Sequence, residues 1–233
     1  MTALFDALEA TWPAAALHRV GPWLIREGRG GGKRVSAATA EAAATEADIA
    51  GMEAMQMSLG QAPLVMIRDG EEALDAMLAA QGYRVIDPVV AYAAPVAAMT
   101  GALPYLAAFT IWPPLAIQRE IWAAGRIGPG RLAVMDRVAG PKTSILARAA
   151  DRPAGAGFVA IHGDTVMAHA LEVAPDLRRQ KAAAHMLRAA ANWAQAAGAT
   201  TFSLVVTEAN AGARALYASL GMTVVGHYHY RMK

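Results

Sequence analysis

Residues 169–183 have the sequence HALEVAPDLRRQKAA, and residues 210–222 have the sequence NAGARALYASLGM. The first stretch is an apolar run that ends at Pro175 and passes through a basic turn into an alanine-rich segment of helical period. At a helix N-terminus, exposed backbone N–H groups and the positive end of the helix dipole stabilise anionic oxygens. The sequence therefore predicts a pyrophosphate site at this turn.

Three basic residues, Arg178, Arg179 and Lys181, stand where this helix is expected to begin. The plain alternative is that they are solvated surface residues. Cations are disfavoured at a helix N-terminus, however, because they meet the positive end of the dipole. An anion between them and the dipole accounts for all three, so we interpret the turn as an anion-binding site.

This order of residues resembles the GNAT superfamily of acyl-CoA-dependent N-acyltransferases. The family pattern is a strand ending in Val-x-Pro, then Arg/Gln-x-x-Gly-x-Gly/Ala, then a helix. Arg178 fills the first position of the turn motif and Ala183 the last. Lys181 stands where the family usually has its first Gly, which is the main departure. A side chain there either crowds the pyrophosphate or swings out to pair with a phosphate.

The second part of the pattern is a strand, an Asn, and a helix that carries Leu-Tyr before a Gly. Its matches in this chain are Asn210, Leu216, Tyr217 and Gly221. Several linked motifs in register make the resemblance more specific than a lone glycine-rich loop. It implies an α/β chain (α+β in the stricter sense) with the GNAT fold, in which a mixed, mostly antiparallel sheet is flanked by helices.

The resemblance also implies transfer of an acetyl group from acetyl-CoA, as co-substrate, to a primary amine by direct attack in a ternary complex. The acceptor stays open between a small-molecule amine and a peptide amine. Backbone groups of Leu171, Glu172 and Val173 would hold the pantetheine arm and the thioester carbonyl. The pyrophosphate would lie on Arg178, Arg179, Gln180, Lys181, Ala182 and Ala183. Tyr217 would protonate the leaving thiolate, with no metal and no covalent enzyme intermediate.

Tyr217 and Asn210 also admit structural interpretations. A Tyr on an amphipathic helix is commonly an interface residue with its hydroxyl near water, and an Asn before a helix is most simply its N-cap. The resemblance adds a contact between Asn210 and the pantetheine arm. For Tyr217 the ordinary phenol pKa of ~10 keeps the proton available at neutral pH, which suits an acid.

A base must accept a proton from the acceptor ammonium, directly or through water. His169 and Glu172 on the expected strand are the candidates, with Glu208 after the next strand as a third. His169 has the more suitable ordinary pKa, although a lone strand His is more often structural. Because side chains alternate along a strand, residues three apart are expected to face opposite sides, so at most one would point into the cleft.

A weak internal repeat relates the two halves of the chain. Residues 76–85 lie in register with residues 215–224, which places Leu78 at the position of Tyr217. Any helix that ends in Gly before a strand has this pattern, because Gly supplies the left-handed cap. The place of each copy at the end of its half nevertheless indicates tandem modules.

We therefore expect a degenerate GNAT-like module over residues 1–105 and a catalytic GNAT module over residues 106–233. The first half has no Arg-x-x-Gly-x-Ala turn before a helix, so acetyl-CoA is expected in the second module alone. The first module would serve packing or acceptor recognition. Its Gly30–Gly32 run lacks the Lys-Ser/Thr ending of a phosphate loop, and we interpret it as a flexible hairpin or an acceptor-side flap.

Composition narrows the alternatives. The 233 residues are 55% hydrophobic and 17% charged, with a formal net charge of +2 and no Cys. Such a chain has material for a core, no cysteine chemistry, and no basic blocks that would indicate nucleic-acid binding. Residues 89–117 carry no charge, but prolines and glycines interrupt them, so we expect buried elements and no membrane span. The start of the chain does not resemble a secretory signal, and we expect a cytoplasmic protein, with homodimerisation open.

Hydrophobic periodicity predicts helices over 4–11, 45–59, 71–81, 115–124, 131–138 and 179–197. It predicts strands over 20–26, 34–38, 64–67, 83–93 with a break at Pro88, 144–149, 155–162, 165–173, 202–206 and 227–230. On the last strand His227 and His229 share a face, but no third metal ligand is in view.

The alternative to an enzyme is a CoA-binding or regulatory protein that has lost catalysis. Lys181 and the degenerate first half favour this alternative.

Overall fold

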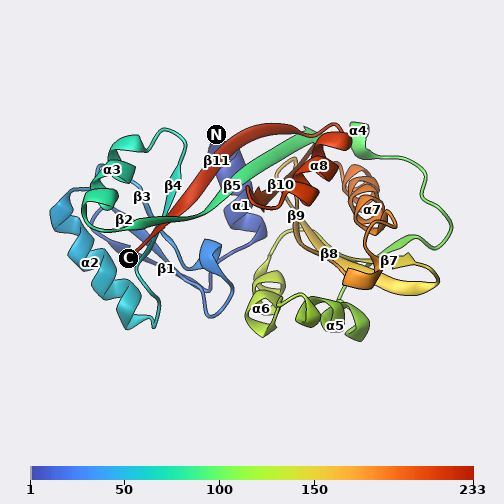
Figure 1. Cartoon of the computed structure of the whole chain (residues 1–233), viewed down its shortest axis with the longest axis horizontal. Helices are drawn as coiled ribbons and strands as arrows, with labels where there is room; N and C mark the ends of the chain where they lie inside the picture. The colour runs from blue at the N-terminus through green and yellow to red at the C-terminus, as the bar shows by residue number, and fades with distance from the viewer. Residues whose placement is uncertain (1) are drawn as a thin grey trace.

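One continuous mixed sheet runs through the whole chain. The structure, a computed structural model, describes residues 2–233, in which eleven strands follow the order β1-β2-β3-β4-β11-β5-β10-β9-β8-β7-β6 (Figure 1). The strands are β1 (Ala16–Val20), β2 (Trp23–Glu27), β3 (Ala38–Ala40), β4 (Leu64–Arg68), β5 (Arg84–Pro95), β6 (Ala108–Ile111), β7 (Lys142–Ala149), β8 (Arg152–His162), β9 (Thr165–Val173), β10 (Thr201–Thr207) and β11 (Thr223–Met232). Only β3-β4 and β9-β10 pair in parallel among the described strands.

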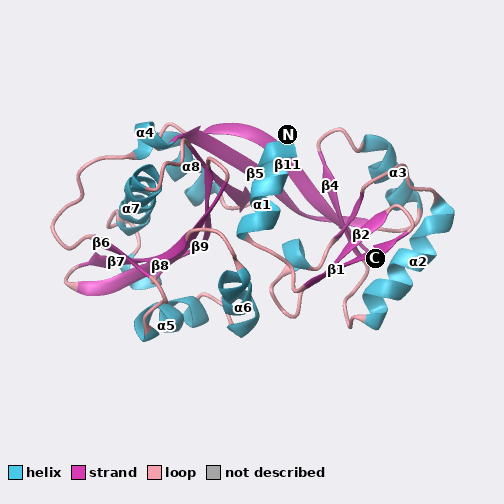
Figure 2. Cartoon of the chain, turned by 180° about the vertical axis from the view of Figure 1, so that it is seen from behind, coloured by secondary structure: helices cyan, strands magenta, loops and turns pink. Residues whose placement is uncertain are grey.

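Helices cover both faces of this sheet. They are α1 (Thr2–Thr11), α2 (Glu46–Ser58), α3 (Glu72–Ala80), α4 (Val96–Met99), α5 (Ala116–Ala124), α6 (Pro129–Arg137), α7 (Ala182–Ala196) and α8 (Ala211–Ser219), with short 3-10 helices η1 (Lys33–Val35) and η2 (Pro175–Leu177). Beside β7–β9, α7 lies on one face and α5 and α6 lie on the other (Figure 2). The mostly antiparallel sheet flanked by helices confirms the expected fold class.

The helix that follows the basic turn is held by its apolar stripe. Met186, Leu187, Ala190 and Ala194 recur at helical spacing on α7 and are buried against the sheet. Small alanines let the helix approach β6–β9 closely, and the burial of this stripe fixes where the N-terminus of α7 lies. The helix ends at Ala196, and Gly198 adopts the left-handed conformation after it (φ 85°).

The two halves repeat the same order of elements. The order β3-α2-β4-α3-β5 in the first half corresponds to β9-α7-β10-α8-β11 in the second, and each begins with a parallel strand pair. The last strand of each half then crosses into the other half. β5 pairs with β10 and β11, whereas β11 pairs with β4 and β5. The halves therefore exchange their final strands within one sheet.

The repeat extends to the helix ends. The N–H of Tyr83 donates to the carbonyl of Leu78 at 3.0 Å, and the N–H of Met222 donates to the carbonyl of Tyr217 at 3.1 Å. The glycine before each of these donors has a positive φ, 84° at Gly82 and 78° at Gly221. The sequence register of the two copies is thus also a structural register.

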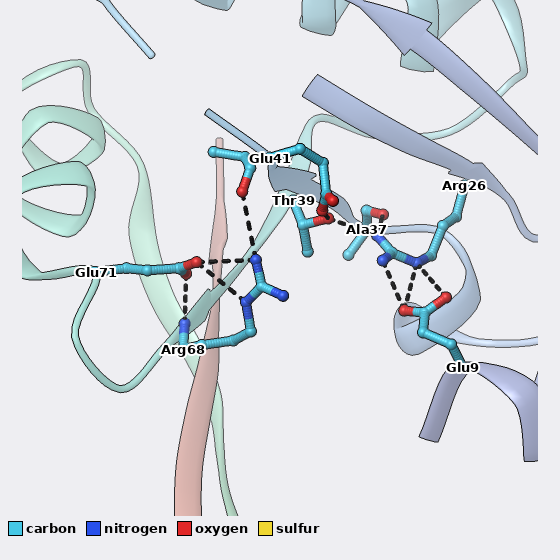
Figure 3. Close-up of polar contacts among 8 residues, drawn as sticks. Glu9, Arg26, Ala37, Thr39, Glu41, Arg68 and Glu71 are labelled. Atoms are coloured by element: carbon cyan, nitrogen blue, oxygen red, sulfur yellow. Dashed lines mark hydrogen bonds and ion pairs between the residues drawn. The ribbon is translucent and has the colours of Figure 1, made fainter. Parts of the chain in front are cut away.

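Helix α1 belongs to the first half in sequence but packs against β8 and β9 of the second half. Arg26 of β2, 3% exposed, ties this helix back to the first half through an ion pair with Glu9. The Arg26 guanidinium also donates to the carbonyl of Ala37 at 3.1 Å and to Thr39 Oγ1 at 3.2 Å (Figure 3). Burial of this charge is tolerated because all of these acceptors surround it.

Several predicted boundaries are wrong. Residues 16–27 form a hairpin, β1-β2, that turns at Gly21, so one predicted strand begins later, at Trp23. The segment after Glu27 joins the antiparallel strands β2 and β3, but it passes through η1, which replaces most of the strand predicted over residues 34–38. β5 runs through Pro88 without ending, because Asp87 takes a positive φ of 43° and forms a bulge that skips one pairing position. Within residues 2–233, the structure has no helix with the length and apolar character that a membrane crossing needs.

Candidate functional site

The N-terminus of α7 is open. Lys181 precedes the first helical residue with φ 65°, and its side chain makes no capping hydrogen bond to any described residue. Arg179 is also left-handed, with φ 64°. Residues 178–181 are all exposed. Left-handed residues in a turn can direct successive N–H groups toward one point, so this turn and the first N–H groups of α7 are suited to an anion.

The backbone at Lys181 explains why Gly is expected at this position. A non-Gly residue in the left-handed region brings its Cβ close to the following carbonyl, at a cost of roughly 1–2 kcal/mol. Lys181 accepts this strain and keeps its side chain in solvent. The helix therefore begins at Ala182, three residues later than the periodicity predicts, because the two left-handed residues stop it from extending further toward the N-terminus.

Arg178 lies against the end of β9. Its Nε donates to the carbonyl of Val173 at 3.2 Å, and its Nη2 lies 3.4 Å from Glu172 Oε1. The Arg178 side chain is 59% exposed, so this ion pair is screened and weak. The guanidinium keeps donors free for an anion at the turn, since only part of its five-donor set is used.

A bulge interrupts β9 just before this end. Ala156 pairs with Glu172 and Phe158 pairs with His169, so Gly157 alone faces the two residues between them, Ala170 and Leu171. Ala170 has φ 51°. Trp122 of α5 donates its Nε1–H to the carbonyl of Ala170 at 2.8 Å, which stabilises the bulge.

The bulge overturns the expectation that His169 and Glu172 face opposite sides of the sheet. Directly paired residues share a face, and the partners of these two, Phe158 and Ala156, lie in the same core cluster under α5 and α6. The extra residue in β9 restores the alternation after a spacing of three. Both side chains therefore lie on the α5–α6 face.

Beyond the bulge β9 and β10 part. Their parallel pairing runs from Thr165 opposite Thr201 to Ala168 opposite Leu204 and then stops. The last residues of β9, Leu171 to Val173, are partly exposed, and they turn from β10 toward Arg178. Backbone groups on this edge of β9 are thus not paired with β10, and η2 and the basic turn connect them to the N-terminus of α7.

His169 is buried, with 5% of its surface exposed, and both ring nitrogens are engaged. Arg34 Nη1 lies 3.1 Å from Nδ1 and can only donate, so the ring proton belongs on Nε2, 2.9 Å from Thr11 Oγ1. The Thr11 hydroxyl donates onward to the carbonyl of Ala7 at 2.6 Å. Burial and the neighbouring Arg34 charge lower the pKa of His169 well below its ordinary value.

Tyr217 of α8 is 6% exposed, and its ring lies 5.6 Å from that of Tyr92, edge to face. Burial, with a smaller contribution from Tyr92, raises the pKa of Tyr217 to about 12. Asn210 caps α8 by accepting the N–H of Ala213 at 3.1 Å, which confirms its structural interpretation. Leu78, the counterpart of Tyr217, is fully buried.

The remaining candidates lie elsewhere. Glu208 is exposed and lines a second pocket with Asp69 and His227, away from the bulge. His229 bonds to Asp75 at 2.7 Å. Among residues 2–233, no cluster of three or more His, Asp or Glu side chains is placed to hold a metal ion.

Sequence reasoning missed two residues beside the bulge, Arg34 and Arg131, which line a pocket together with His169 and Ala170. Gly31 and Gly32 border the same pocket, and Gly30 and Gly31 pack closely on α6. The sequence shows the glycines but not that the two segments meet. Glycines face each other across this contact, at Gly30 and Gly130, and such pairs mark a close approach of two backbones.

Residues 115–222 match the model of the Acetyltransferase (GNAT) family. Residues 115–222 thus carry a GNAT domain. The match ends just after the helix with Tyr217 and includes the bulge, the basic turn and α7. No curated protein matches the sequence.

Solved structures of similar fold cover nearly all of the chain. A GCN5-related N-acetyltransferase from Kribbella flavida superposes with a TM-score of 0.72 at 16% identity, over 99% of this chain and 94% of that one. A conserved protein of unknown function from Staphylococcus epidermidis gives 0.70 at 10% identity, over 95% and 94%. A tandem GNAT protein from the clavulanic acid biosynthesis pathway gives 0.61 at 12% identity, over 84% and 74%. At these identities the likeness establishes the GNAT fold and leaves the acceptor open.

Proposed function

We propose that this protein is an acetyl-CoA-dependent N-acetyltransferase that acts on a primary amine. One observation carries the proposal, namely the open N-terminus of α7 behind a basic turn with two left-handed residues, where β9 and β10 part. GNAT enzymes use acetyl-CoA as co-substrate. The turn suits its pyrophosphate because uncapped N–H groups, the helix dipole and cationic side chains converge there.

Acetyl-CoA, when bound, supplies the thioester that the amine attacks. In this proposal, backbone groups at Leu171, Glu172 and Val173 hold the pantetheine arm and the thioester carbonyl, and residues 178–183 hold the pyrophosphate. Asn210 adds a contact to the pantetheine arm. Tyr217 gives its proton to the leaving sulfur, and its raised pKa keeps that proton in place throughout the physiological pH range.

Geometry favours Glu172 over His169 as the base. The Glu172 side chain is 21% exposed and lies on the α5–α6 face, where a water molecule can reach its carboxylate. His169 has no free lone pair, because Nδ1 already accepts from Arg34. We therefore propose that Glu172 accepts the ammonium proton through water and that His169 positions Arg34.

We propose one acetyl-CoA site per chain, in the module over residues 106–233. The helix that corresponds to α7 in the other module is α2, and its first turn carries Glu46 and Asp48. The Asp48 carboxylate accepts the N–H of Thr45 at 2.8 Å, so a negative charge already lies at that helix N-terminus. A phosphate there would meet repulsion, which agrees with a degenerate first module.

The rival function is CoA binding or regulation without catalysis. Calorimetric titration with acetyl-CoA and free-thiol release over a panel of amines separate the two. We expect one acetyl-CoA per chain and thiol release with at least one amine. Binding without turnover on any amine would favour the rival, and two bound acetyl-CoA molecules, or none, would contradict the single site.

A further inference from the structure

A pocket of about 280 Å³ lies between the two halves of the chain, beside the bulge of β9. The bulge, the end of β10 and the tyrosines of β11 form part of its wall. The rest comes from the loop over residues 31–34, Arg131 of α6, Trp12 of α1, and Asp87 and Val89 of β5. Its volume suits a ligand of about amino-acid size, somewhat below the range of drug-sized ligands.

The charges in this pocket do not balance. Its lining holds three cations, Lys33, Arg34 and Arg131, and one carboxylate, Asp87. Lys33 forms an ion pair with Asp87. Neither arginine takes part in an ion pair within residues 2–233. Two guanidinium groups therefore share a partly enclosed space without a compensating carboxylate.

Arg34 is held in place by other contacts. His169 accepts from its Nη1 at 3.1 Å, and its guanidinium carbon lies 6.0 Å from the centre of the Trp12 ring. Its Nε is buried and has no hydrogen-bond partner among the described residues. A neutral imidazole and an aromatic ring fix the direction of this cation without neutralising its charge.

Arg131 lies across the glycine loop. A Cβ added to Gly32 would be 3.4 Å from its Nε, so the bare backbone leaves room for the guanidinium. The side chain forms no hydrogen bond within residues 2–233 that fixes it elsewhere. Close packing of Gly130 on Gly30 sets the position of this helix turn relative to the loop. The contact between the glycine loop and the first turn of α6 therefore places Arg131, a second cation, at the pocket.

We infer that the acceptor is a small primary amine that also carries an anionic group, a carboxylate or a phosphate, which Arg34 and Arg131 bind. Planar guanidinium groups pair with both anions through two parallel hydrogen bonds. The amine would then face Ala170 and the parting strands. The amine part of this inference rests on the proposed acetyl transfer, whereas the anionic part rests only on the pocket. The two arginines disfavour polycationic amines in this pocket.

Matched pairs of amines test the inference. Thiol release from acetyl-CoA is measured with L-phenylalanine against phenethylamine, with phosphoethanolamine against ethanolamine, and with spermidine. We expect kcat/KM to favour the anionic member of at least one pair by about tenfold or more, because charge-assisted hydrogen bonds would be lost with the other member. The carboxylate and phosphate pairs tell the two anions apart. Equal rates within both pairs, or a preference for spermidine, would overturn the inference while leaving the acetyl transfer intact.

Variants test whether Arg34 and Arg131 cause the preference for the anionic amine. Arg34→Gln and Arg131→Gln should each reduce it at least about tenfold, whereas Arg34→Lys should retain part of it, because the charge remains without the planar fork. Arg119→Gln on α5 is the control, since Arg119 is exposed and lies outside the pocket. Unchanged acetyl-CoA affinity and circular dichroism establish that each variant is folded. A preference that survives both arginine substitutions places the anion elsewhere.

A binding experiment keeps the two proposals separate. N-Acetyl-L-phenylalanine and N-acetylphenethylamine are titrated in the presence of CoA, and thermal stabilisation is recorded. If no amine releases thiol, the proposed activity fails, yet a larger stabilisation by the carboxylate, lost in Arg34→Gln, would still establish the anion site. Equal stabilisation by both compounds would contradict the proposed anion site.

Discussion

A histidine beside an expected active site is a natural candidate for a base, and His169 shows how its neighbours decide otherwise. The guanidinium of Arg34 can only donate, so it occupies the Nδ1 lone pair and leaves Nε2 as a donor to Thr11. Burial then penalises the charged imidazolium. The residue is better suited to hold Arg34 than to carry a proton.

This assignment makes stability depend on pH. The pKa of His169 is lowered in the folded state, so below about pH 6.5 the unfolded chain binds a proton that the folded chain does not. The free energy of unfolding should therefore fall by up to ~1.4 kcal/mol per pH unit as the pH drops from about 6.5. Urea denaturation between pH 7.5 and 5 should show this slope in the wild type and a shallower one in His169→Gln. Identical slopes would mean that His169 is protonated in the folded protein.

Tyr217 carries the other prediction at this scale. Tyr217→Phe keeps the ring and its packing on Tyr92 but removes the proton donor to the leaving sulfur. We expect turnover to fall by on the order of 10²–10⁴-fold with acetyl-CoA affinity nearly unchanged. Tyr105→Phe is the control, because Tyr105 is 92% exposed. Wild-type turnover in Tyr217→Phe, with chemistry shown to be rate-limiting, would remove Tyr217 from the mechanism.

At the scale of elements, long periodic segments are predictable and special backbone conformations are not. α7 and β9 follow from apolar spacing because burial enforces it. The bulge at Ala170 leaves no mark in the β9 sequence, since its causes are Gly157 opposite and Trp122 on another element. The face of His169 and Glu172 was predicted wrongly for this reason.

The site shows the same limit. The turn before α7 could be predicted because its own residues carry the charge. The pocket could not, because Arg34 and Arg131 are nearly a hundred residues apart in the sequence and meet only through the packing of two glycines. Strand exchange could not be predicted either, because local periodicity predicts where a strand lies in the sequence but not which strand it pairs with.

The glycine contact can be tested with a matched pair. Gly130 and Gly212 each occupy the second position of a helix, α6 and α8. A Cβ at Gly130 would collide with the carbonyl of Gly30, whereas the nearest atom to a Cβ at Gly212 within residues 2–233 is 4.0 Å away.

Gly130→Ala should therefore lower the free energy of unfolding by about 1–3 kcal/mol through overpacking. Gly212→Ala should raise it slightly, by up to ~1 kcal/mol, because Ala is the better helix former. Chemical denaturation measures both. Equal effects of the two substitutions would show that the loop yields easily and does not hold α6.

At the scale of the molecule, the exchanged strands β5 and β11 join the two modules that the sequence repeat indicates. Both neighbours of β11 in the described sheet, β4 and β5, come from residues 1–105. Both neighbours of β5, β10 and β11, come from residues 106–233. The proposed division near residue 105 is thus a division of sequence into modules, while the backbone hydrogen bonds of each module's final strand depend on the other module.

This dependence predicts how the chain folds. A fragment of residues 106–233 would leave β11 without either of its strand partners and would expose the edge of β10, so its backbone groups would lack the partners that burial requires. We expect this fragment to be unfolded or aggregated by circular dichroism, although it contains the whole matched GNAT domain. Adding residues 1–105 in trans should restore structure and acetyl-CoA binding, because both missing strands then return.

In the intact chain, hydrogen exchange should give amides of β4 and β10 the same opening free energy, since neither half can open while keeping the exchanged strand of the other. A folded, acetyl-CoA-binding fragment of residues 106–233 would show instead that β5 and β11 are held weakly and that the catalytic module is self-sufficient.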